Sequence, residues 1–300
     1  MLIVTALGGN ALLERGQAMT AANQEANVRR AVETLAQLIA VGHRLVITHG
    51  NGPQVGMLAM QAAAANQQSA FPLDVLDAES AGMIGYMIEQ ELRNVLKGKP
   101  VATLLSQVKV DGRDRAFEHP TKFVGAGYDQ QTALRLAAEN AWQVALDGAK
   151  WRRVVASPEP KEILGLDVIR LLLEHDVTII CAGGGGIPVV DAGDGRIEGS
   201  EAVIDKDLVS ALLARNLGAD MLLMLTDVDA VYSDYGTPAA KALSRVAAAE
   251  VEPYGFPAGS MGPKIAAAAG FARATGKVAA IGRLDDALAI VDGQSGTWIS

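Results

Sequence analysis

Residues 2–10 read LIVTALGGN, and this stretch indicates the class of fold. A mostly apolar run, Leu2 to Leu7, leads directly into Gly8, Gly9 and Asn10. A short apolar run that ends in a turn is typical of a strand buried on both faces of a parallel sheet. Two glycines at its end let the backbone approach an anion closely, although a tight turn before a helix would use the same residues.

Two later segments repeat this arrangement of apolar run and glycine loop. Residues 45–48 lead into HGNGPQVG (49–56), and residues 177–182 lead into four consecutive glycines (183–186). Such loops gather at the carboxyl edge of an open α/β sheet, where helix N-termini offer N–H groups to anions. The spacing matches neither a Rossmann fingerprint nor a Walker A motif. For His49 we expect hydrogen bonds that fix the loop rather than acid–base catalysis.

Helical stretches alternate with these apolar runs. The alternation predicts a mainly parallel sheet that is covered by helices on both faces. Further strands are predicted at 101–105, 221–226 and 278–281, and helices at 27–41, 80–96, 207–217 and 264–275.

The composition limits the possible partners. Half of the 300 residues are hydrophobic, which is enough for a large core in one α/β domain or two joined lobes. A formal net charge of −8 argues against a nucleic-acid or anionic-membrane surface. Because no apolar stretch could span a bilayer and no basic leader opens the chain, we expect a cytoplasmic protein. The single cysteine, Cys181, cannot form an internal disulfide, and no Cys/His spacing suggests a zinc site.

The stretch from 108 to 157 breaks the alternation of strands and helices. It contains the polar turn 111–115, Pro120 and the basic, aromatic cluster 150–153. We predict an inserted subdomain here, within a single domain that covers residues 1–300. A long surface excursion without function is the alternative.

Two lysines stand at predicted strand-to-helix junctions. Lys206 directly precedes a helix for which Asp207 is a plausible N-cap. Lys264 ends GSMGPK (259–264), a loop entering a helix, and such a loop offers N–H groups and one ammonium to a phosphate. Simple capping would use the same residues. The segment TDVDAVY (226–232) offers groups for a purine or ribose, whereas a calcium loop is disfavoured because no glutamate closes it.

In this order, these segments resemble the carbamate kinases within the amino acid kinase superfamily, from Leu2 to about Gly282. The resemblance implies a three-layer αβα sandwich, a homodimer, ATP or ADP with Mg²⁺ held mainly by the phosphates, and a protruding subdomain over the active site. The implied reaction is phosphoryl transfer between carbamoyl phosphate and ADP. The motifs are ALGGNAL, HGNGPQVG, TK with Gly125 three residues after Lys122, RVVASP, GGGGIPV, EAVIDKD, LTDVDAVY and GSMGPK.

The resemblance also implies roles for single residues. Lys122 would reach in from the subdomain, Lys206 and Lys264 would neutralise the nucleotide phosphates, and Asp205 would orient the lysines. The carbamate and the transferring phosphoryl group would be held by Gly8, Gly9, Asn10, Gly50, Asn51 and Gly52. The nucleotide would be bordered by Gly183, Gly184, Thr226, Asp229, Tyr232, Gly259, Ser260 and Met261.

Two residues of the inserted region depart from the family pattern. Ala126 and Ala156 stand where proline is usual, so they affect the geometry of the subdomain and the reach of Lys122. The core motifs are untouched.

The residue types suit phosphoryl transfer, which needs alignment and charge neutralisation more than a covalent intermediate. Carbamate is already an anion, so no general base is expected. The glycine loops contain no arginine to clamp a larger acyl substrate. Two alternatives remain: a phosphotransferase of the same superfamily with a different small carboxylate, and a catalytically silent, nucleotide-binding regulatory subunit. Retention of Lys122, Asp205, Lys206 and Lys264 together argues against the silent subunit.

Overall fold

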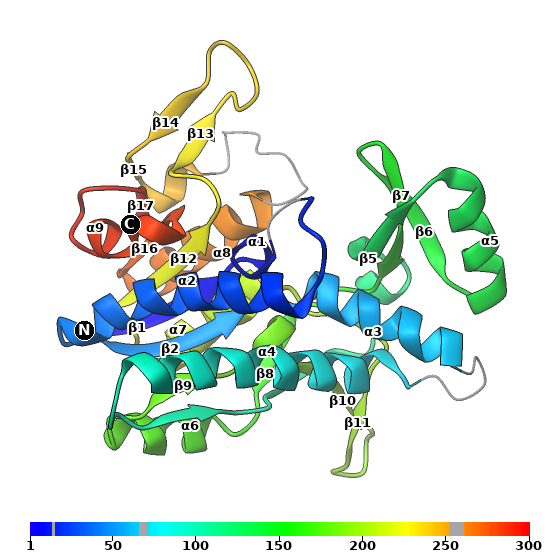
Figure 1. The fold of residues 1–300 in the computed structure, drawn as a ribbon, viewed down its shortest axis with the longest axis horizontal. Coiled ribbons are helices and arrows are strands. Elements are labelled where there is room, and N and C mark those ends of the chain that lie inside the picture. Colours follow the sequence, from blue (N-terminus) through cyan, green and yellow to red (C-terminus); the bar gives the residue numbers. More distant parts are fainter. Residues whose placement is uncertain (14–15, 66–70, 252–260) are drawn as a thin grey trace.

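An eight-stranded sheet lies at the centre of the computed structural model, which describes residues 1–13, 16–65, 71–251 and 261–300 (Figure 1). All neighbouring strands run parallel except β16 and β17, so the prediction of a mainly parallel sheet is confirmed. Across the sheet the order is β15 (Arg245–Val246), β17 (Thr297–Ile299), β16 (Val278–Arg283), β12 (Met221–Thr226), β1 (Leu2–Leu7), β2 (Arg44–His49), β9 (Thr178–Ile180) and β3 (Val101–Thr103).

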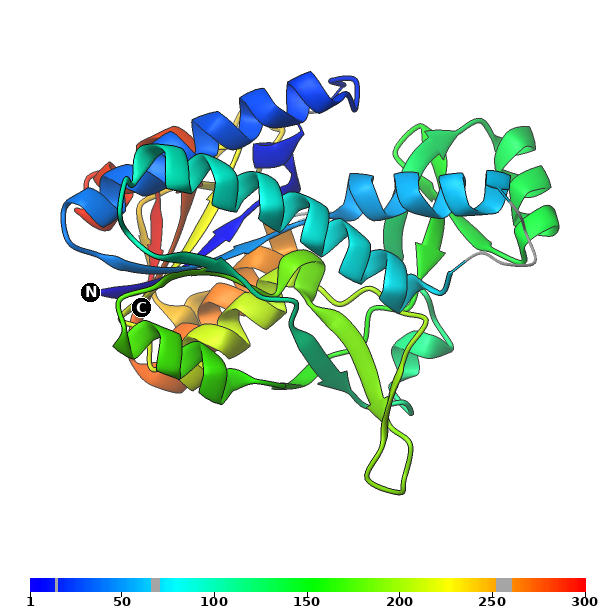
Figure 2. The same ribbon diagram turned by 60° about the horizontal axis from the view of Figure 1, so that its bottom comes forward.

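Strand β1 is buried on both faces of the sheet. Leu2, Val4 and Ala6 join one hydrophobic core, whereas Ile3 and Leu7 join the other, because successive side chains of a strand point to opposite faces. Helices cover both cores, so the three-layer αβα sandwich is confirmed (Figure 2). On the face of Ile3 lie α2 (Ala21–Ala40), α4 (Leu73–Val95) and α9 (Ala287–Val291), and on the other face lie α6 (Leu166–Glu174), α7 (Lys206–Leu217) and α8 (Met261–Thr275).

Three smaller sheets flank the sandwich. One of them, formed with helix α5 (Gln130–Asn140), stands apart from the main body in Figure 1. It contains β5 (Lys122–Tyr128), β7 (Lys150–Val155) and β6 (Gln143–Asp147). The others contain β11 (Ile197–Gly199), β10 (Ile187–Asp191), β4 (Gln107–Val110) and β8 (Pro160–Ile163), and the pair β13 (Val231–Ser233) and β14 (Lys241–Leu243).

The separate unit covers only part of the predicted insertion. Residues 122–155 form it, whereas β4 pairs with β8 and β10 in a different sheet. A functional lid over 108–157 therefore stays a prediction.

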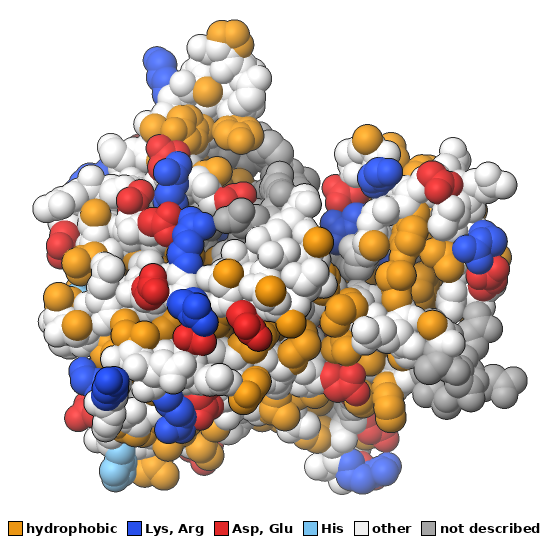
Figure 3. Space-filling view, in the orientation of Figure 1, with side chains coloured by type: hydrophobic (Ala, Val, Ile, Leu, Met, Phe, Trp, Pro, Cys, Tyr) orange, Lys and Arg blue, Asp and Glu red, His pale blue; other side chains and the backbone are white. Residues whose placement is uncertain are grey.

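The distribution of surface charges and the lengths of the helices bear on contacts with polyanions and membranes. On the face in Figure 3, Lys and Arg side chains lie among Asp and Glu side chains. Within the described ranges, no helix is both long and apolar enough to cross a bilayer.

Candidate active site

The ends of β1, β2 and β12 lie at one level of the sheet. Leu7 is in register with both His49 and Leu225, so the segments that follow these strands start side by side. The Gly8 N–H donates to the Leu225 carbonyl at 2.9 Å, and the Gly50 N–H donates to the Leu7 carbonyl at 3.1 Å. The loops that begin at Gly8 and Gly50 therefore form one rim together with the end of β12.

The two glycine loops on this rim touch each other. A Cβ on Gly50 would lie 3.2 Å from the Gly9 nitrogen. Two helices start here, the single turn α1 (Gly9–Leu12) and the longer α3 (Gly52–Ala65). The side chain of Asn10 is outside the described residues.

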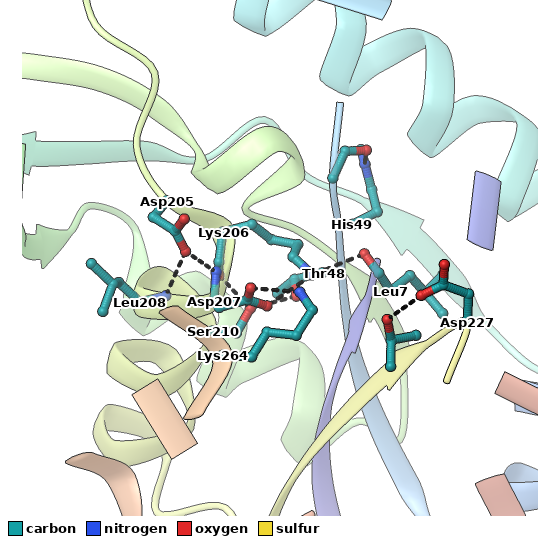
Figure 4. A network of polar contacts seen from close by, with 12 residues as sticks. Leu7, Thr48, His49, Asp205, Lys206, Asp207, Leu208, Ser210, Asp227 and Lys264 are labelled. Carbon is teal, nitrogen blue, oxygen red and sulfur yellow. Dashed lines mark hydrogen bonds and ion pairs between the residues drawn. The ribbon is translucent and has the colours of Figure 1, made fainter. Parts of the chain in front are cut away.

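Asp207 joins two lysines beside this rim (Figure 4). Its carboxylate oxygens lie 2.9 Å from Lys206 Nζ and 2.7 Å from Lys264 Nζ. Lys206 Nζ also donates to the Leu7 carbonyl at 3.1 Å, which ties the pair to the end of β1. All three charged side chains are at most 12% exposed. Two ammonium groups from different helices are thus fixed next to the glycine loops.

The prediction that Asp207 caps the helix is wrong. Helix α7 begins at Lys206, one residue earlier than predicted, and its N-cap is Asp205. Asp205 Oδ1 accepts from the Asp207 N–H at 2.9 Å and from the Leu208 N–H at 3.4 Å. Asp207 is therefore released from capping, and its side chain turns to the lysines. The sequence analysis missed this role because it depends on where the helix starts.

Burial and charge set the ionisation of this group. Burial opposes the ionisation of Asp207, but the ammonium groups of Lys206 and Lys264 outweigh it and hold the pKa of Asp207 below its usual range. Burial lowers the pKa of Lys206 to about 8, although Asp207 partly offsets this effect. An anion placed against Lys206 would favour its charged form.

Lys122 approaches the same region from the separate unit. Its Nζ donates to Asp205 Oδ2 at 2.6 Å, while the other oxygen of Asp205 caps α7. Asp205 therefore contacts one of the three lysines, Lys122, and Asp207 contacts the other two. Strand β5, which begins with Lys122, packs closely on α3, where a Cβ on Gly56 would overlap the backbone of Gly125.

His49 is buried behind the loop that it precedes. Its side chain is 1% exposed, and its Nδ1 lies 3.2 Å from the Gly50 carbonyl. Burial lowers the pKa of His49 to about 4, so the ring is neutral near pH 7. A neutral ring bonded to its own loop fits the expected loop-fixing role.

Two of the four successive glycines, Gly183 and Gly184, lie against side chains at the end of β2 and in the loop that follows it. A Cβ on Gly183 would lie 2.5 Å from His49 Nε2, and a Cβ on Gly184, which has φ +71°, would overlap the carboxamide of Asn51. Gly183 and Gly184 were expected beside the nucleotide. That placement stays a prediction, and the contacts described here are with His49 at the end of β2 and with Asn51 in the loop that follows.

The segment after β12 gathers the other expected nucleotide residues. Thr226 Oγ1 donates to Asp227 Oδ1 at 3.0 Å, and the Tyr232 hydroxyl donates to the Asp229 carboxylate at 3.1 Å. Met261 is the first residue of α8, which also carries Lys264. Gly259 and Ser260 lie outside the described residues.

Asp77 and Ser80 were not named from the sequence, and Asp207 was named there only as a helix cap. Asp77 and Ser80 stand three residues apart on α4, both are at most 1% exposed, and both bind the Asn51 side chain. A carboxylate and a hydroxyl at this spacing on an otherwise apolar helix face were the available signal. In the described part of the chain, no three His, Cys, Asp or Glu side chains meet as metal ligands.

The fold and this site define a member of the amino acid kinase family, to which the chain belongs: the model of that family matches residues 1–282. Within it, the chain groups with the carbamate kinases. It is 53% identical to a carbamate kinase of Rhizobium meliloti over 100% of this chain and 93% of the relative, and 54% identical to one of Haemophilus influenzae over 100% and 97%. The resemblance is therefore confirmed.

Solved structures agree with this grouping. The carbamate kinase from Giardia lamblia bound to AMP-PNP superposes with a TM-score of 0.91 at 41% identity, covering 99% of this chain and 98% of that one. A more distant match is N-acetylglutamate synthase from Neisseria gonorrhoeae, with a TM-score of 0.60 at 15% identity over 100% of this chain and 61% of that one. The second match shows the fold alone.

Proposed function

We propose that this rim transfers the phosphoryl group of carbamoyl phosphate to ADP, giving ATP and carbamate, which decays to ammonia and CO₂. The observation that carries the proposal is the pair of ammonium groups that Asp207 holds 2.9 and 2.7 Å from its oxygens, next to two touching glycine loops. Buried, preorganised cations beside backbone N–H groups stabilise the charge that develops on a transferring phosphoryl group. The family supplies the substrate: curated relatives over the full chain are carbamate kinases.

The position of each residue on the rim suggests which part of the substrates it would bind. The loops of Gly8, Gly9 and Asn10, and of Gly50, Asn51 and Gly52, would hold the carbamoyl and phosphoryl groups through N–H donors. Lys206 and Lys264, next to these loops, would neutralise the nucleotide phosphates. Lys122 would leave Asp205 for the phosphoryl group, since both the carboxylate and a phosphate attract an ammonium.

The bond changes need no proton transfer. The bond from phosphorus to the carbamoyl oxygen breaks, its electron pair leaves with carbamate, and a β-phosphate oxygen of ADP forms the new bond to phosphorus. Neither anion requires a general base, which agrees with a neutral, buried His49.

Nucleotide would lie along Thr226, Asp229, Tyr232 and the start of α8. The Giardia lamblia relative was solved with AMP-PNP, and we extend nucleotide binding to this chain. The carboxylates of Asp205 and Asp207 are already bound by lysines, so Mg²⁺ would be held mainly by the nucleotide phosphates, and when bound it supplies further charge neutralisation. Residues 122–155 would form most of the lid. We also propose that the chain forms a homodimer, which sedimentation analysis of the purified chain would test. We propose a cytoplasmic location as well, which cell fractionation would test.

ATP formation from carbamoyl phosphate, ADP and Mg²⁺ tests the proposed function. Lys206→Ala and Lys264→Ala should each lower kcat by about a hundredfold or more, because each removes a preorganised cation. Near-normal turnover in both variants would remove the assignment. ATP consumption with glutamate derivatives, but none with carbamate, would favour another phosphotransferase of the superfamily. Nucleotide binding without turnover of any of these substrates would favour a silent subunit.

A further inference from the structure

The carboxamide of Asn51 is held by two acceptors on helix α4. Its nitrogen donates to Asp77 Oδ1 at 2.9 Å and to Ser80 Oγ at 2.8 Å, and the side chain is 2% exposed. A carboxamide nitrogen carries two hydrogens, so both are used by these bonds. The remaining polar atom is Asn51 Oδ1, which has no partner among the described residues.

Ser80 decides which way the Asn51 amide faces. The Ser80 hydroxyl donates its one proton to the backbone carbonyl of Asp77 at 3.0 Å. Toward Asn51, Ser80 Oγ can therefore only accept, and the Asn51 nitrogen must face α4. This reasoning holds in either protonation state of the Asp77 side chain.

Two further contacts restrict the amide. The Asn51 carboxamide packs against Gly184, and a Cβ on Gly184 would overlap the carboxamide, so this close approach depends on a glycine. Asp77 is 1% exposed, and its Oδ2 has no hydrogen-bond partner. Burial raises the pKa of Asp77 well above its usual range, and Asp74 and Glu201 raise it further. A raised pKa favours the neutral form of Asp77, which places less negative charge beside a loop that would receive an anion.

An acceptor on this loop is chemically selective. The glycine N–H groups and the lysines are donors, which suit phosphate and carboxylate oxygens. A carboxamide oxygen repels such oxygens but binds an N–H group. Carbamoyl phosphate has an NH₂ group where acetyl phosphate has a methyl group, and the two are otherwise alike. A site that hydrogen-bonds an N–H group rejects an analogue without it, because the acceptor is then left unpaired.

Resting on the proposed function, we propose that Asn51 Oδ1 accepts a hydrogen bond from the amino group of carbamoyl phosphate. Ser80 and Asp77 are then positioning residues that hold the amide in the selective orientation. Asn51 makes the site select an amino group over a methyl group or an oxygen.

The test compares kcat/KM for carbamoyl phosphate and acetyl phosphate, each with ADP and Mg²⁺. The natural chain should prefer carbamoyl phosphate by roughly a hundredfold or more. In Ser80→Ala the amide can turn over, so this preference should fall by about tenfold, through a higher KM for carbamoyl phosphate and with the KM for ADP unchanged. Asp77→Asn keeps an acceptor at Oδ1, so it should largely retain the preference.

Ser106→Ala is the matched control. Ser106 is a buried serine whose Oγ accepts from the Ala182 N–H at 3.1 Å, next to the same glycine run, but it does not contact Asn51. The Ser106→Ala variant should prefer carbamoyl phosphate over acetyl phosphate to the same extent as the natural chain.

The outcomes separate the two proposals. Equal loss with both substrates in Ser80→Ala would show a merely structural serine and overturn the inference. A natural chain that uses both substrates equally well would also overturn it, and that measurement needs no variant if Ser80→Ala does not fold. No ATP from either substrate would instead overturn the proposed function.

Discussion

Gly56 in α3 and Gly125 in β5 are in direct backbone contact, and a Cβ on Gly56 would overlap the nitrogen and Cα of Gly125. Gly125 has φ +72°, and the pairing of β5 with β7 shifts its register between Val124 and Tyr128. This contact fixes how closely helix α3, which follows the loop of Gly50, packs against strand β5, which begins with Lys122.

We expect Gly56→Ala to impair catalysis through this contact. The added methyl group must push β5 away from α3, which moves Lys122. Overpacking of this kind costs about 1–3 kcal/mol of stability, and kcat should fall by about tenfold or more because misplaced catalytic groups lose rate steeply. Gly270→Ala in α8 is the control, because a Cβ there has nothing within 4 Å. An unchanged kcat in folded Gly56→Ala would contradict this view of the contact.

Asp207→Asn should destabilise the free protein strongly. It leaves the ammonium groups of Lys206 and Lys264 buried without their carboxylate, a change that costs about 3–5 kcal/mol in comparable buried pairs. Added ADP with Mg²⁺ should restore stability, because phosphates replace the missing charge. Urea unfolding with and without nucleotide measures both effects. Asp191→Asn, which breaks the surface pair with Lys109, should leave the midpoint unchanged, and an equally small change in Asp207→Asn would argue against the bridge.

Nucleotide binding should take up protons near pH 8. The pKa of Lys206 is lowered to about 8 by burial, so roughly half of the side chains are neutral at that pH, and bound phosphates would recharge them. Calorimetric titration with ADP in buffers of different ionisation enthalpy should show uptake at pH 8 and little at pH 6.5. Lys206→Arg should bind without uptake, since arginine stays charged. Equal heats in all buffers at pH 8 would show that phosphates do not reach Lys206.

Stability should fall as the pH drops from 6.5 toward 4, partly because of His49. Its pKa is about 4 in the folded protein and 6.5 unperturbed, so in this window the unfolded chain binds more protons than the folded one. The loss should reach about 3 kcal/mol at the lower end. His49→Gln should flatten this part of the profile in urea unfolding. Parallel profiles for His49→Gln and the natural chain would contradict the assignment.

Thiol reagents should not inhibit the native protein. Cys181, the single cysteine, is 1% exposed, and burial raises the pKa of its thiol to about 12. Ellman's reagent should therefore find no reactive thiol until the chain is unfolded, when it should find one. Rapid labelling of the native chain together with loss of ATP formation would show that the β9 end opens in solution.

Six of the eight strands of the main sheet could be predicted from the sequence because they are mostly apolar runs, whereas β15 and β17, with two and three residues, were not predicted. The predicted strand at 221–226 is observed with the same bounds, and 45–48 is found as Arg44–His49. The helix starts were predicted too late: 27–41 is observed as Ala21–Ala40, and 80–96 as Leu73–Val95. The first turns of α2 are mostly polar and lack a clear apolar period, so packing rather than local pattern extends that helix. Helix α4 instead opens with Leu73 and Leu76, which are buried and three residues apart, so a local signal for its earlier start was present.

The site was predictable where a motif is local and not where it depends on distant contacts. Lys206 and Lys264 could be found because each stands at a strand-to-helix junction. The bridge through Asp207 depends on a one-residue shift of the start of α7, and the contact of Gly56 with Gly125 joins segments that no local pattern relates. Propensity and spacing do not specify such contacts.

The central place of β1 also governs how this chain can be assembled. Its hydrogen-bonding edges are completed by β2 on one side and by β12 on the other, and the Leu2 N–H is bound by Asp220, 218 residues further along. The edge of β1 that pairs with β12 therefore stays unpaired until most of the polypeptide has emerged from the ribosome. Pairings of such long sequence separation form slowly, so the nascent chain exposes apolar surface that is prone to aggregation during synthesis.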